Sequence, residues 1–302
     1  MKTLREALDE AAQRRVALGH FNVSDLVTLR AVAESARELN VPVLAGVSEG
    51  ERAFMGLRQA AALVQSIRDE SGLAIFLNAD HTYSIAKAVE AASAGFDAIV
   101  FDGSALPFDR NVSETRKAVE AVKAINSQIL VEGEIGYIGS GSEIHEARPA
   151  AAGMLTTPEE ASQFVAGTGV DVLAPAVGNM HGLLPDMIRG EAHKRLDIGR
   201  IAGIKAAAGV FMTLHGGSGT ADEDFVSAIA AGINIIHINT ELRIAWRQSL
   251  ERALTASPNE VAPYRILAPA VESVKRVVSS RLSLFNGQEP SGNRAALQSN
   301  MP

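Results

Sequence analysis

The most regular feature of the chain is an alternation between short apolar runs and longer segments in which apolar residues recur at helical spacing. The short runs are centred near residues 18, 44, 77, 99, 131, 173, 212 and 236. Each is short enough to be a buried parallel strand, and each is followed by a helix or by a loop and a helix. These eight units predict an α/β fold, namely a (β/α)8 TIM barrel, with a doubly wound open sheet as the alternative.

One domain is expected over residues 1–286, because no linker or shift in composition divides the chain. The Gly-, Ser- and Asn-rich stretch 287–302 is expected to be a disordered tail. The polar stretch from Tyr137 to Met154 exceeds an ordinary connection and indicates a functional loop or lid. Helices are expected at 1–15, 26–39, 56–71, 85–94, 112–125, from about 157, and at 198–208, 222–231, 242–256 and 268–285, with irregular structure at 107–110 and 183–195.

The composition excludes several classes of protein. The formal net charge is −7, which argues against a surface for nucleic acid or for an anionic membrane. The absence of cysteine excludes disulfides and thiolate metal ligands, so a metal would need histidine and carboxylate ligands. No apolar run approaches the roughly 20 residues that span a bilayer, and the N-terminal segment has no apolar signal region, so we expect a cytoplasmic protein.

Polar residues follow two neighbouring predicted strands at their carboxyl ends, where α/β folds bind ligands. Asp80 and His81 end the run that begins at Ile75, and Asp102 follows the next run. A neutral imidazole at this place is a good zinc ligand, and an adjacent carboxylate can transfer a proton. Taken alone, the pair has an ordinary alternative, in which Asp80 caps the next helix and His81 forms local hydrogen bonds.

Three histidines, His81, His181 and His215, lie at the ends of three different predicted strands. In a barrel the carboxyl ends of all strands meet at one mouth, so these side chains are expected to be neighbours. Three histidines with an open fourth position form a catalytic zinc arrangement that can polarise a substrate oxygen. On the strand near residue 131, Glu132 and Glu134 alternate and are expected to point to the same side.

Glycines follow two of these histidines. Gly182 comes directly after His181, and the segment HGGSG begins at His215. Without side chains in the way, backbone N–H groups can approach a phosphate, and the helix that follows adds its positive end. One such cluster commonly means a tight turn, but its repetition at two strand ends favours phosphate binding. Of the remaining histidines, His145 and His193 are expected to be solvated.

Taken together, these segments give the chain a family resemblance. It resembles the zinc-dependent class II ketose-bisphosphate aldolases, the group that holds fructose-bisphosphate and tagatose-bisphosphate aldolases. The resemblance runs in family order from about residue 1 to about residue 286. The matching segments are FNVSDL from Phe21, PVLAGVSEG from Pro42, NADHTYS from Asn78, VFDGSALPFDRNVSET from Val100, VEGEIGYIG from Val131, AVGNMHG from Ala176, LHGGSG from Leu214 and INTEL from Ile238.

The resemblance implies a metal-dependent aldolase that acts on a phosphorylated ketose and yields dihydroxyacetone phosphate. The catalytic cofactor would be Zn²⁺, with a second divalent or a monovalent cation as an additional one. Asp80 would be the acid/base group for a substrate hydroxyl. The implied metal residues are His81, His181, His215, Asp102 and Glu134, and the implied substrate-binding residues are Ser48, Gly182, Gly216, Ser218, His237, Asn239 and Thr240.

Two positions depart from the family pattern. Where the long loop usually reads GGEED, residues 139–143 read GSGSE, which places Ser142 at the glutamate that exchanges a proton. Glu143 is our hypothesis for the catalytic acid, on condition that the loop shifts by one residue. On the last strand, His237 stands where the family has a substrate-binding Asn. It would either donate to the same substrate oxygens or change the substrate.

The implied activity is reversible cleavage of a ketose bisphosphate, foremost fructose 1,6-bisphosphate, to dihydroxyacetone phosphate and glyceraldehyde 3-phosphate. The alternatives are an aldolase for tagatose 1,6-bisphosphate or another ketose 1-phosphate, and a non-catalytic barrel that binds sugar phosphates. The family also implies a homodimer or homotetramer, in which the C-terminal helix of a neighbouring subunit supplies a basic residue to the far phosphate. Arg276 is the candidate, with Lys275 and Arg281 beside it, although all three also fit a solvated helix face.

Overall fold

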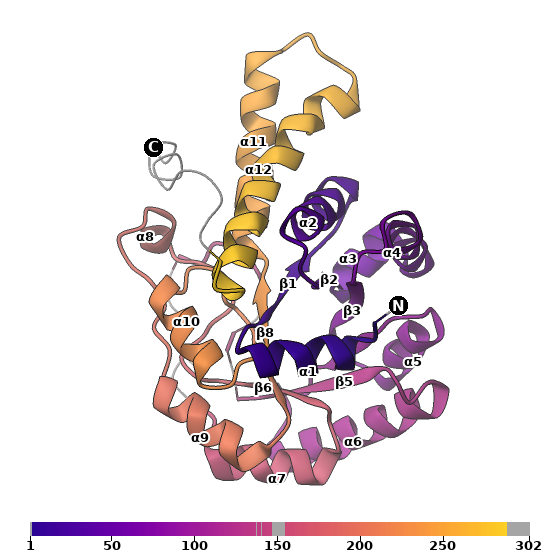
Figure 1. Cartoon of the computed structure of the whole chain (residues 1–302), viewed down its shortest axis with the longest axis vertical. Helices are drawn as coiled ribbons and strands as arrows, with labels where there is room; N and C mark the ends of the chain where they lie inside the picture. The colour runs from indigo at the N-terminus through magenta and orange to yellow at the C-terminus, as the bar shows by residue number, and fades with distance from the viewer. Residues whose placement is uncertain (1, 137, 140, 147–154, 289–302) are drawn as a thin grey trace.

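The computed structural model describes residues 2–136, 138–139, 141–146 and 155–288. Within these ranges the chain forms a closed barrel of parallel strands in sequence order, and the last strand pairs back onto the first (Figure 1). The predicted (β/α)8 barrel is confirmed, and the open-sheet alternative is wrong. The strands are β1 (Leu18–Asn22), β2 (Val43–Val47), β3 (Ile75–Thr82), β4 (Ala98–Phe101), β5 (Leu130–Ile135), β6 (Val172–Pro175), β7 (Phe211–Leu214) and β8 (Ile235–Ile238).

Helices connect successive strands and surround the barrel (Figure 1). Most of them present one apolar face to the strands, which is the pattern that the sequence predicts. They are α1 (Leu4–Arg14), α2 (Leu26–Leu39), α3 (Glu49–Met55), α4 (Leu57–Ser71), α5 (Ile85–Ser93), α6 (Phe108–Ile125), α7 (Pro158–Thr168), α8 (Pro185–Ile188), α9 (Ile198–Ala208), α10 (Asp222–Ala230), α11 (Thr240–Ala256) and α12 (Pro263–Phe285).

Helix α1 closes the end of the barrel at which the strands begin. Its buried Leu4 and Leu8 share an apolar cluster with Leu18, Phe76 and Leu130, which lie at or near the start of their strands. The helix begins at a capping box, in which the Thr3 side chain accepts from the Glu6 N–H and the Glu6 carboxylate accepts from the Thr3 N–H. Because this end is sealed, the opposite end of the barrel is left for ligands.

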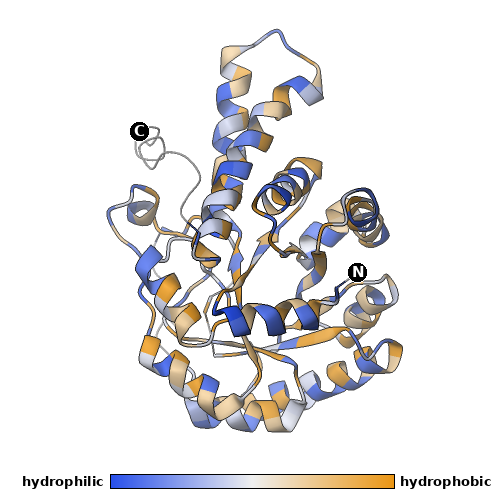
Figure 2. Ribbon diagram, in the orientation of Figure 1, coloured by the Kyte–Doolittle hydropathy of each residue, from blue (hydrophilic) through white to orange (hydrophobic). Residues whose placement is uncertain are grey.

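The main core lies between the barrel and its helices. It is built largely from Val, Ile, Leu and Ala with a few phenylalanines such as Phe164 and Phe225, in keeping with the low aromatic content of the sequence. Figure 2 shows that the helices around the barrel carry both hydrophobic and hydrophilic residues, as expected for helices with one buried and one exposed face. None of the described helices is long and apolar enough to cross a membrane.

Several element boundaries differ from the sequence-based expectation. Helix α3 is not predicted at all, and α8 falls within a stretch expected to be irregular. Helix α6 begins at Phe108, inside an expected loop, because Pro107 ends the preceding turn and can stand just before a helix. Helix α12 begins at Pro263 and continues through Pro269, which lies in the second turn and, having no N–H, cannot donate to the carbonyl of Arg265. At its other end, residues 286–288 form a turn, and 289–302 lie outside the described residues.

Helices α11 and α12 form a hairpin that projects from the ring of helices (Figure 1). At its base α12 packs against α2, and Ser35 Oγ donates to the carbonyl of Lys275 at 3.2 Å. Toward its tip the hairpin exposes Leu254, Val261 and Tyr264. The base therefore belongs to the barrel, whereas the tip carries exposed apolar side chains.

Candidate metal centre

An irregularity in β3 brings two adjacent side chains to one place. In a regular strand Asp80 and His81 would point to opposite faces of the sheet. Here the pairing with β4 shifts register between Ala79 and Thr82, and His81 adopts a positive φ of 36°. Strained residues and bulges of this kind gather at functional sites. The result is that His81 Nε2 lies 3.9 Å from Asp80 Oδ1.

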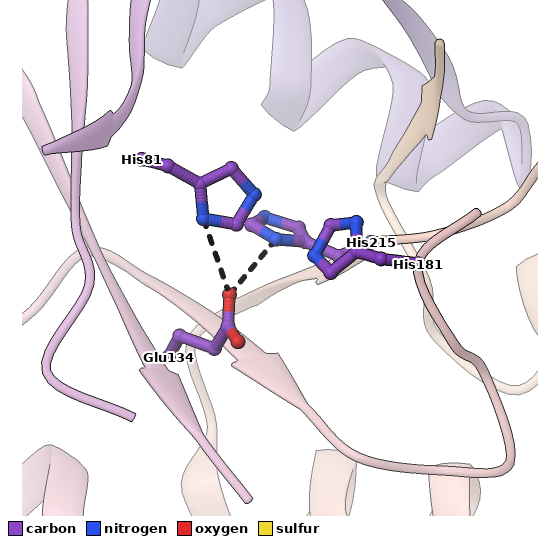
Figure 3. Close-up of side chains that lie close together, drawn as sticks. All are labelled: His81, Glu134, His181 and His215. Carbon is purple, nitrogen blue, oxygen red and sulfur yellow. Dashed lines mark ion pairs between the residues drawn. The ribbon is translucent and has the colours of Figure 1, made fainter. Parts of the chain in front are cut away.

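Three histidines and one glutamate converge at the mouth of the barrel (Figure 3). His81 lies on β3, Glu134 on β5, and His181 and His215 on the loops after β6 and β7. One ligand atom from each of these residues lies within 4.8 Å of the others. The ring centroid of His81 is 4.9 Å from that of His181 and 5.0 Å from that of His215. The histidines that the sequence places at separate strand ends are therefore neighbours.

Carboxylates in contact with two of the rings orient them. His215 Nε2 lies 2.6 Å from Oε1 of Glu132, whose other oxygen accepts a 2.8 Å hydrogen bond from Thr213 Oγ1. His81 Nδ1 lies 2.9 Å from Oδ2 of Asp102. In metal centres such a partner fixes the tautomer and direction of a ligating imidazole. Asp102, which the resemblance counts among the metal residues, occupies the position of a partner to His81 in this structure.

The histidines of the cluster differ in their affinity for protons. Burial lowers the pKa of His81, but the charge of Asp80 and the hydrogen bond to Asp102 outweigh it and raise that pKa to about 9. Burial likewise opposes protonation of His215, yet the glutamates of β5 raise its pKa well above the ordinary value. The pKa of His181 falls well below its ordinary value because of burial and the charges of the other two histidines. Binding of a cation therefore has to displace protons from this site.

Several buried atoms of the cluster have no hydrogen-bond partner within the part of the chain that the structure describes. They are Glu134 Oε2, His181 Nε2 and His215 Nδ1. Glu134 Oε2 and His215 Nδ1 are 3.0 Å apart, but they lack the geometry of a hydrogen bond. A buried polar atom left unpaired costs about 1–3 kcal/mol. A divalent metal among these atoms would pair with them, so the residues present fit such an ion.

Asp80 is held beside the cluster from two sides. Its Oδ2 accepts a 2.9 Å hydrogen bond from Asn22 Nδ2, and its Oδ1 lies 3.5 Å from His237 Nδ1. Burial by itself raises the pKa of Asp80, but the charge of His81 and the contact with His237 keep that pKa well below its ordinary value. Asp80 is therefore ionised and able to accept a proton. The alternative in which Asp80 caps the next helix is wrong, because Ser84 Oγ caps α5.

His237 belongs to a column of stacked imidazoles. Its ring centroid lies 3.5 Å from that of His20, with an interplanar angle of 3°, and 4.2 Å from that of His215. His20 Nε2 in turn lies 3.2 Å from Asn78 Oδ1. Burial, followed by the charges of the neighbouring histidines, keeps the pKa of His237 well below its ordinary value. A neutral imidazole thus links Asp80 to the metal cluster.

The loops after β6 and β7 approach each other closely. Gly182 and Gly216 have φ values of 72° and 59°, and a Cβ on Gly216 would lie only 2.3 Å from the carbonyl oxygen of Met180. Only glycine fits here, since both the left-handed backbone and the short contact exclude a side chain. Ser218 Oγ accepts from the N–H of Asn239 at 3.3 Å. The glycine loops therefore lie at the N-terminus of α11, a place that favours phosphate.

Comparison with known proteins decides the family. The family model described as "Fructose-bisphosphate aldolase class-II" matches residues 2–289. The chain is 31% identical over 287 residues to a fructose-bisphosphate aldolase from Geobacillus stearothermophilus, covering 94% of this chain and 96% of that one. The chain belongs to the class-II fructose-bisphosphate aldolase family. It is an aldolase, and therefore a lyase, and its family works with a divalent metal.

Other relatives of this aldolase agree with the assignment. A probable fructose-bisphosphate aldolase from Bacillus subtilis strain 168 is 32% identical over 287 residues, with 94% of this chain and 96% of that one covered. Among solved structures, the YdjI aldolase from Escherichia coli K12 has a TM-score of 0.76 and 25% identity. A putative fructose-1,6-biphosphate aldolase from Coccidioides immitis has a TM-score of 0.79 and 25% identity. Both comparisons cover 94% of this chain and 96% of the other.

The described part of the aldolase's long loop packs on the loop after β6. The Leu183 N–H donates to the carbonyl of Glu143 at 3.0 Å, and the His145 N–H donates to the carbonyl of Leu183 at 2.8 Å. Glu143 itself is exposed. The expectation that His145 is solvated is wrong, because a Cβ on Gly182 would lie 2.3 Å from its buried Nε2. His193 is exposed, as expected, and residues 147–154 lie outside the described part of the loop.

The three basic residues of α12 have different surroundings. Lys275 forms a 2.6 Å ion pair with Glu38. Arg281 makes two hydrogen bonds, of 2.9 and 3.0 Å, to the carboxylate of Glu241. Arg276 is exposed on the helix surface. Of the three, Arg276 is therefore the one that lies open to solvent.

Sequence reasoning missed a polar cluster around Glu51 in α3. Its buried carboxylate accepts from the Ser48 N–H at 2.7 Å, from Asn22 Nδ2 at 2.9 Å and from Arg243 at 2.8 Å. Arg243 also donates to the carbonyl of Ser142 at 3.2 Å, so the cluster connects the long loop to the barrel. The spacing of Ser48 and Glu51 is that of a capping box, which is a signal that could have revealed α3.

Two further buried charges of the aldolase have partners that the sequence does not reveal. Glu132 supports His215, and its alternation with Glu134 was visible in the sequence, but its partner was not. Lys194 is 1% exposed and contacts backbone carbonyls near the metal cluster. It lies in a charged stretch expected to be irregular, where no pattern distinguishes it from a surface lysine.

Proposed function

We propose that this aldolase reversibly cleaves a ketose bisphosphate, foremost fructose 1,6-bisphosphate, to dihydroxyacetone phosphate and glyceraldehyde 3-phosphate. The observation that carries the proposal is the convergence of three histidines and Glu134, with the carboxylate of Asp80 beside His81. Relatives named fructose-bisphosphate aldolase support the same substrate.

The proposed metal is Zn²⁺, held by His81, His181 and His215. Imidazole nitrogens with a nearby carboxylate suit zinc, and the chain has no thiolate to attract softer ions. When bound, the ion would polarise the substrate carbonyl and stabilise the negative charge that develops as the carbon–carbon bond breaks. Glu134 and Asp102 are proposed to serve a second or alternative cation.

Asp80 is proposed to accept the proton of the substrate hydroxyl that becomes the aldehyde. Asn22 holds Oδ2, whereas Oδ1 has no hydrogen-bond partner among the described residues and is the atom proposed to take the proton. Its lowered pKa keeps the carboxylate ionised before the reaction. A positioned group of this kind contributes roughly 10²–10⁴-fold to the rate.

Glu143 is proposed to return a proton to the carbon left by bond cleavage. Its backbone is tied to Leu183, directly after Gly182, while its side chain is exposed and free to turn inward. In this chain Ser142 stands where the family has the glutamate, and its hydroxyl is too weak an acid to replace a carboxyl group at neutral pH. The proposal therefore assigns the proton exchange to the next residue along the loop.

The phosphate of the dihydroxyacetone half is proposed to bind where the glycine loops meet α11. The residues there share backbone N–H groups or hydroxyls close to a helix N-terminus, which together favour a phosphate. They are Gly182, Gly216, Ser218, Asn239 and Thr240, with Ser48 and His237 toward the rest of the substrate.

A second candidate substrate is tagatose 1,6-bisphosphate or another ketose 1-phosphate. The observation that favours it is His237, which contacts Asp80 from the position of the family's substrate-binding Asn. Because the ring stacks against both His20 and His215, it cannot turn away from the substrate without disturbing them. A changed donor at this point would change the preferred configuration of the substrate hydroxyls.

We also propose that the aldolase is a cytoplasmic homodimer or homotetramer. Support comes from the hairpin of α11 and α12, whose tip exposes Val261 by 84% and Tyr264 by 70%. Apolar side chains exposed to this extent on a projecting hairpin are expected to be covered by a second subunit. In such an assembly Arg276 would contact the far phosphate of a neighbouring active site.

The test is a comparison of kcat/KM for fructose 1,6-bisphosphate, tagatose 1,6-bisphosphate and fructose 1-phosphate with zinc-loaded protein. We expect the first to be cleaved best, and fructose 1-phosphate to have a raised KM because it lacks the far phosphate. A higher kcat/KM for tagatose 1,6-bisphosphate would replace our first substrate by the second. The Arg276→Ala variant should raise the KM of the bisphosphate alone.

A further inference from the structure

Lys194 is a buried lysine whose ammonium group is surrounded by backbone carbonyls. The side chain is 1% exposed. Its Nζ donates to the carbonyl oxygens of Met180 at 2.7 Å, Gly182 at 2.7 Å and Gly216 at 2.9 Å. An ammonium group has three N–H donors, and these three carbonyl oxygens offer an acceptor for each of them. Burying a charge away from water is expensive unless it is fully hydrogen-bonded, and here it is.

The three carbonyls belong to the two loops that form the site. Met180 and Gly182 flank His181, and Gly216 follows His215. The backbone of Lys194 is joined to the second loop as well, because its N–H donates to the carbonyl of Gly219 at 2.9 Å. One residue therefore ties together the segments that carry two metal-cluster histidines and the proposed phosphate-binding glycines.

The positive charge of Lys194 lowers the pKa of two neighbouring groups. It contributes to the lowered pKa of His181, after burial and the other histidines, and to the lowered pKa of Glu241. Glu241 accepts a 2.8 Å hydrogen bond from the N–H of Gly219, in the same loop. Backbone carbonyl oxygens that converge on one point can coordinate a monovalent cation such as K⁺, and here the lysine ammonium lies among three of them.

We propose that Lys194 is a positioning residue that acts as a tethered monovalent cation. It holds the carbonyls of the two glycine loops inward, so that their N–H groups face the phosphate, and it supplies fixed positive charge at that subsite. This aldolase consequently needs no free K⁺ or Na⁺ there, because the carbonyl cage is already occupied. The inference rests on the proposed function for its phosphate ligand.

The test compares Lys194→Ala, which leaves an empty cage, with Lys194→Met, which fills it with an uncharged chain. Lys205→Met is the control, since Lys205 also bonds a backbone carbonyl, that of Val210 at 2.7 Å, but at the start of β7. The KM for fructose 1,6-bisphosphate, kcat and bound zinc are measured while KCl or methylammonium chloride replaces choline chloride at constant ionic strength. Thermal unfolding is followed in the same series.

We expect the KM, kcat and melting temperature of wild type and of Lys205→Met to be the same with each cation. Lys194→Ala should bind zinc but show a KM raised by about tenfold or more, as expected for loss of a charge-assisted contact, and K⁺ or methylammonium should restore it. Lys194→Met should show the same rise in KM, and neither K⁺ nor methylammonium should reverse it. The melting temperature of Lys194→Ala alone should rise with K⁺.

Three results would overturn the inference. They are a requirement of the wild-type enzyme for K⁺, an unchanged KM in Lys194→Met, or a Lys194→Ala variant that no cation restores in KM or in melting temperature. Failure of wild type to cleave any ketose phosphate would count against the proposed function instead. In that case the cation-dependent melting of Lys194→Ala still decides whether the lysine occupies a cation cage.

Discussion

The Nε2 atom of His215 lies 2.6 Å from Oε1 of Glu132, and this contact determines which nitrogen of the ring faces the metal cluster. Both residues are buried, and Thr213 holds the second oxygen of the carboxylate. The arrangement leaves His215 Nδ1 directed toward Glu134, 3.0 Å away. The metal centre thus depends on a carboxylate that would not itself touch the ion.

Replacing Glu132 by Gln is expected to weaken zinc binding by about tenfold to a hundredfold, because an amide orients the imidazole less well and no longer raises its basicity. Competition with a fluorescent zinc chelator measures the change. Glu120→Gln, an exposed residue of α6, serves as the control and should bind zinc normally. Equal zinc affinity in both variants would show that Glu132 has no part in the centre.

His215→Ala and Asp80→Asn are expected to separate metal binding from proton transfer. His215→Ala should lose both zinc and turnover, since it removes a proposed ligand. Asp80→Asn should retain zinc and lose roughly 10²–10⁴-fold in kcat, because an amide cannot accept the proton. Zinc content by mass spectrometry and steady-state kinetics give the two readouts. Near-normal cleavage by Asp80→Asn would remove Asp80 from its assigned role.

Glu143→Ala is expected to slow exchange of the dihydroxyacetone phosphate C–H proton with solvent, whereas Ser142→Ala should leave it unchanged. The reason is that only the carboxyl group is acidic enough to exchange a proton at neutral pH. Deuterium incorporation followed by NMR reports this step directly. If Ser142→Ala lost exchange and Glu143→Ala kept it, the assignment along the loop would have to be reversed.

The ion pair of Arg281 and Glu241 is expected to give stability that depends on pH. Burial raises the pKa of Glu241, but Arg281 outweighs it, and the pKa lies below the ordinary value of 4.5. The stabilisation is therefore complete above about pH 4.5 and is lost as the pH falls through the folded-state pKa. Arg281→Met should lower the free energy of unfolding near neutral pH by about 3 kcal/mol, because it leaves a buried carboxylate without its partner.

Denaturant unfolding at several pH values between neutrality and acid checks this prediction. The difference between wild type and Arg281→Met should shrink as the solution becomes acidic. Arg247→Met, which removes an exposed pair with Glu251 on α11, is the control and should have a small effect at every pH. If the difference in the free energy of unfolding between wild type and Arg281→Met were the same at every pH, lost packing and not lost charge would explain the lower stability of the variant.

The fold and the three histidines could be predicted from the sequence because they depend on local patterns. Eight apolar runs with helices between them define the barrel, and each histidine lies at the end of such a run or in the loop that follows it. The barrel then brings His81, His181 and His215 together without any further information. The ligand cluster of Figure 3 is a consequence of topology.

The residues that support the site could not be predicted in the same way. Glu132 contacts His215, which lies 83 positions later in the sequence. Lys194 donates to the carbonyl of Gly216, although it lies in a charged stretch whose composition is typical of a protein surface. The sequence around His145 is typical of a solvated loop, yet its ring packs closely against Gly182. These contacts depend on packing between loops, which leaves no periodic signal in the sequence.

The central claim is that the histidine cluster holds a divalent metal with which this aldolase cleaves a ketose bisphosphate. Release of triose phosphate from fructose 1,6-bisphosphate, measured before and after chelation and again after zinc is restored, tests it most directly. The account predicts release that the chelator abolishes and zinc restores. Cleavage that persists in protein shown to be free of metal would contradict it, as would absence of release from every ketose phosphate by protein with zinc bound.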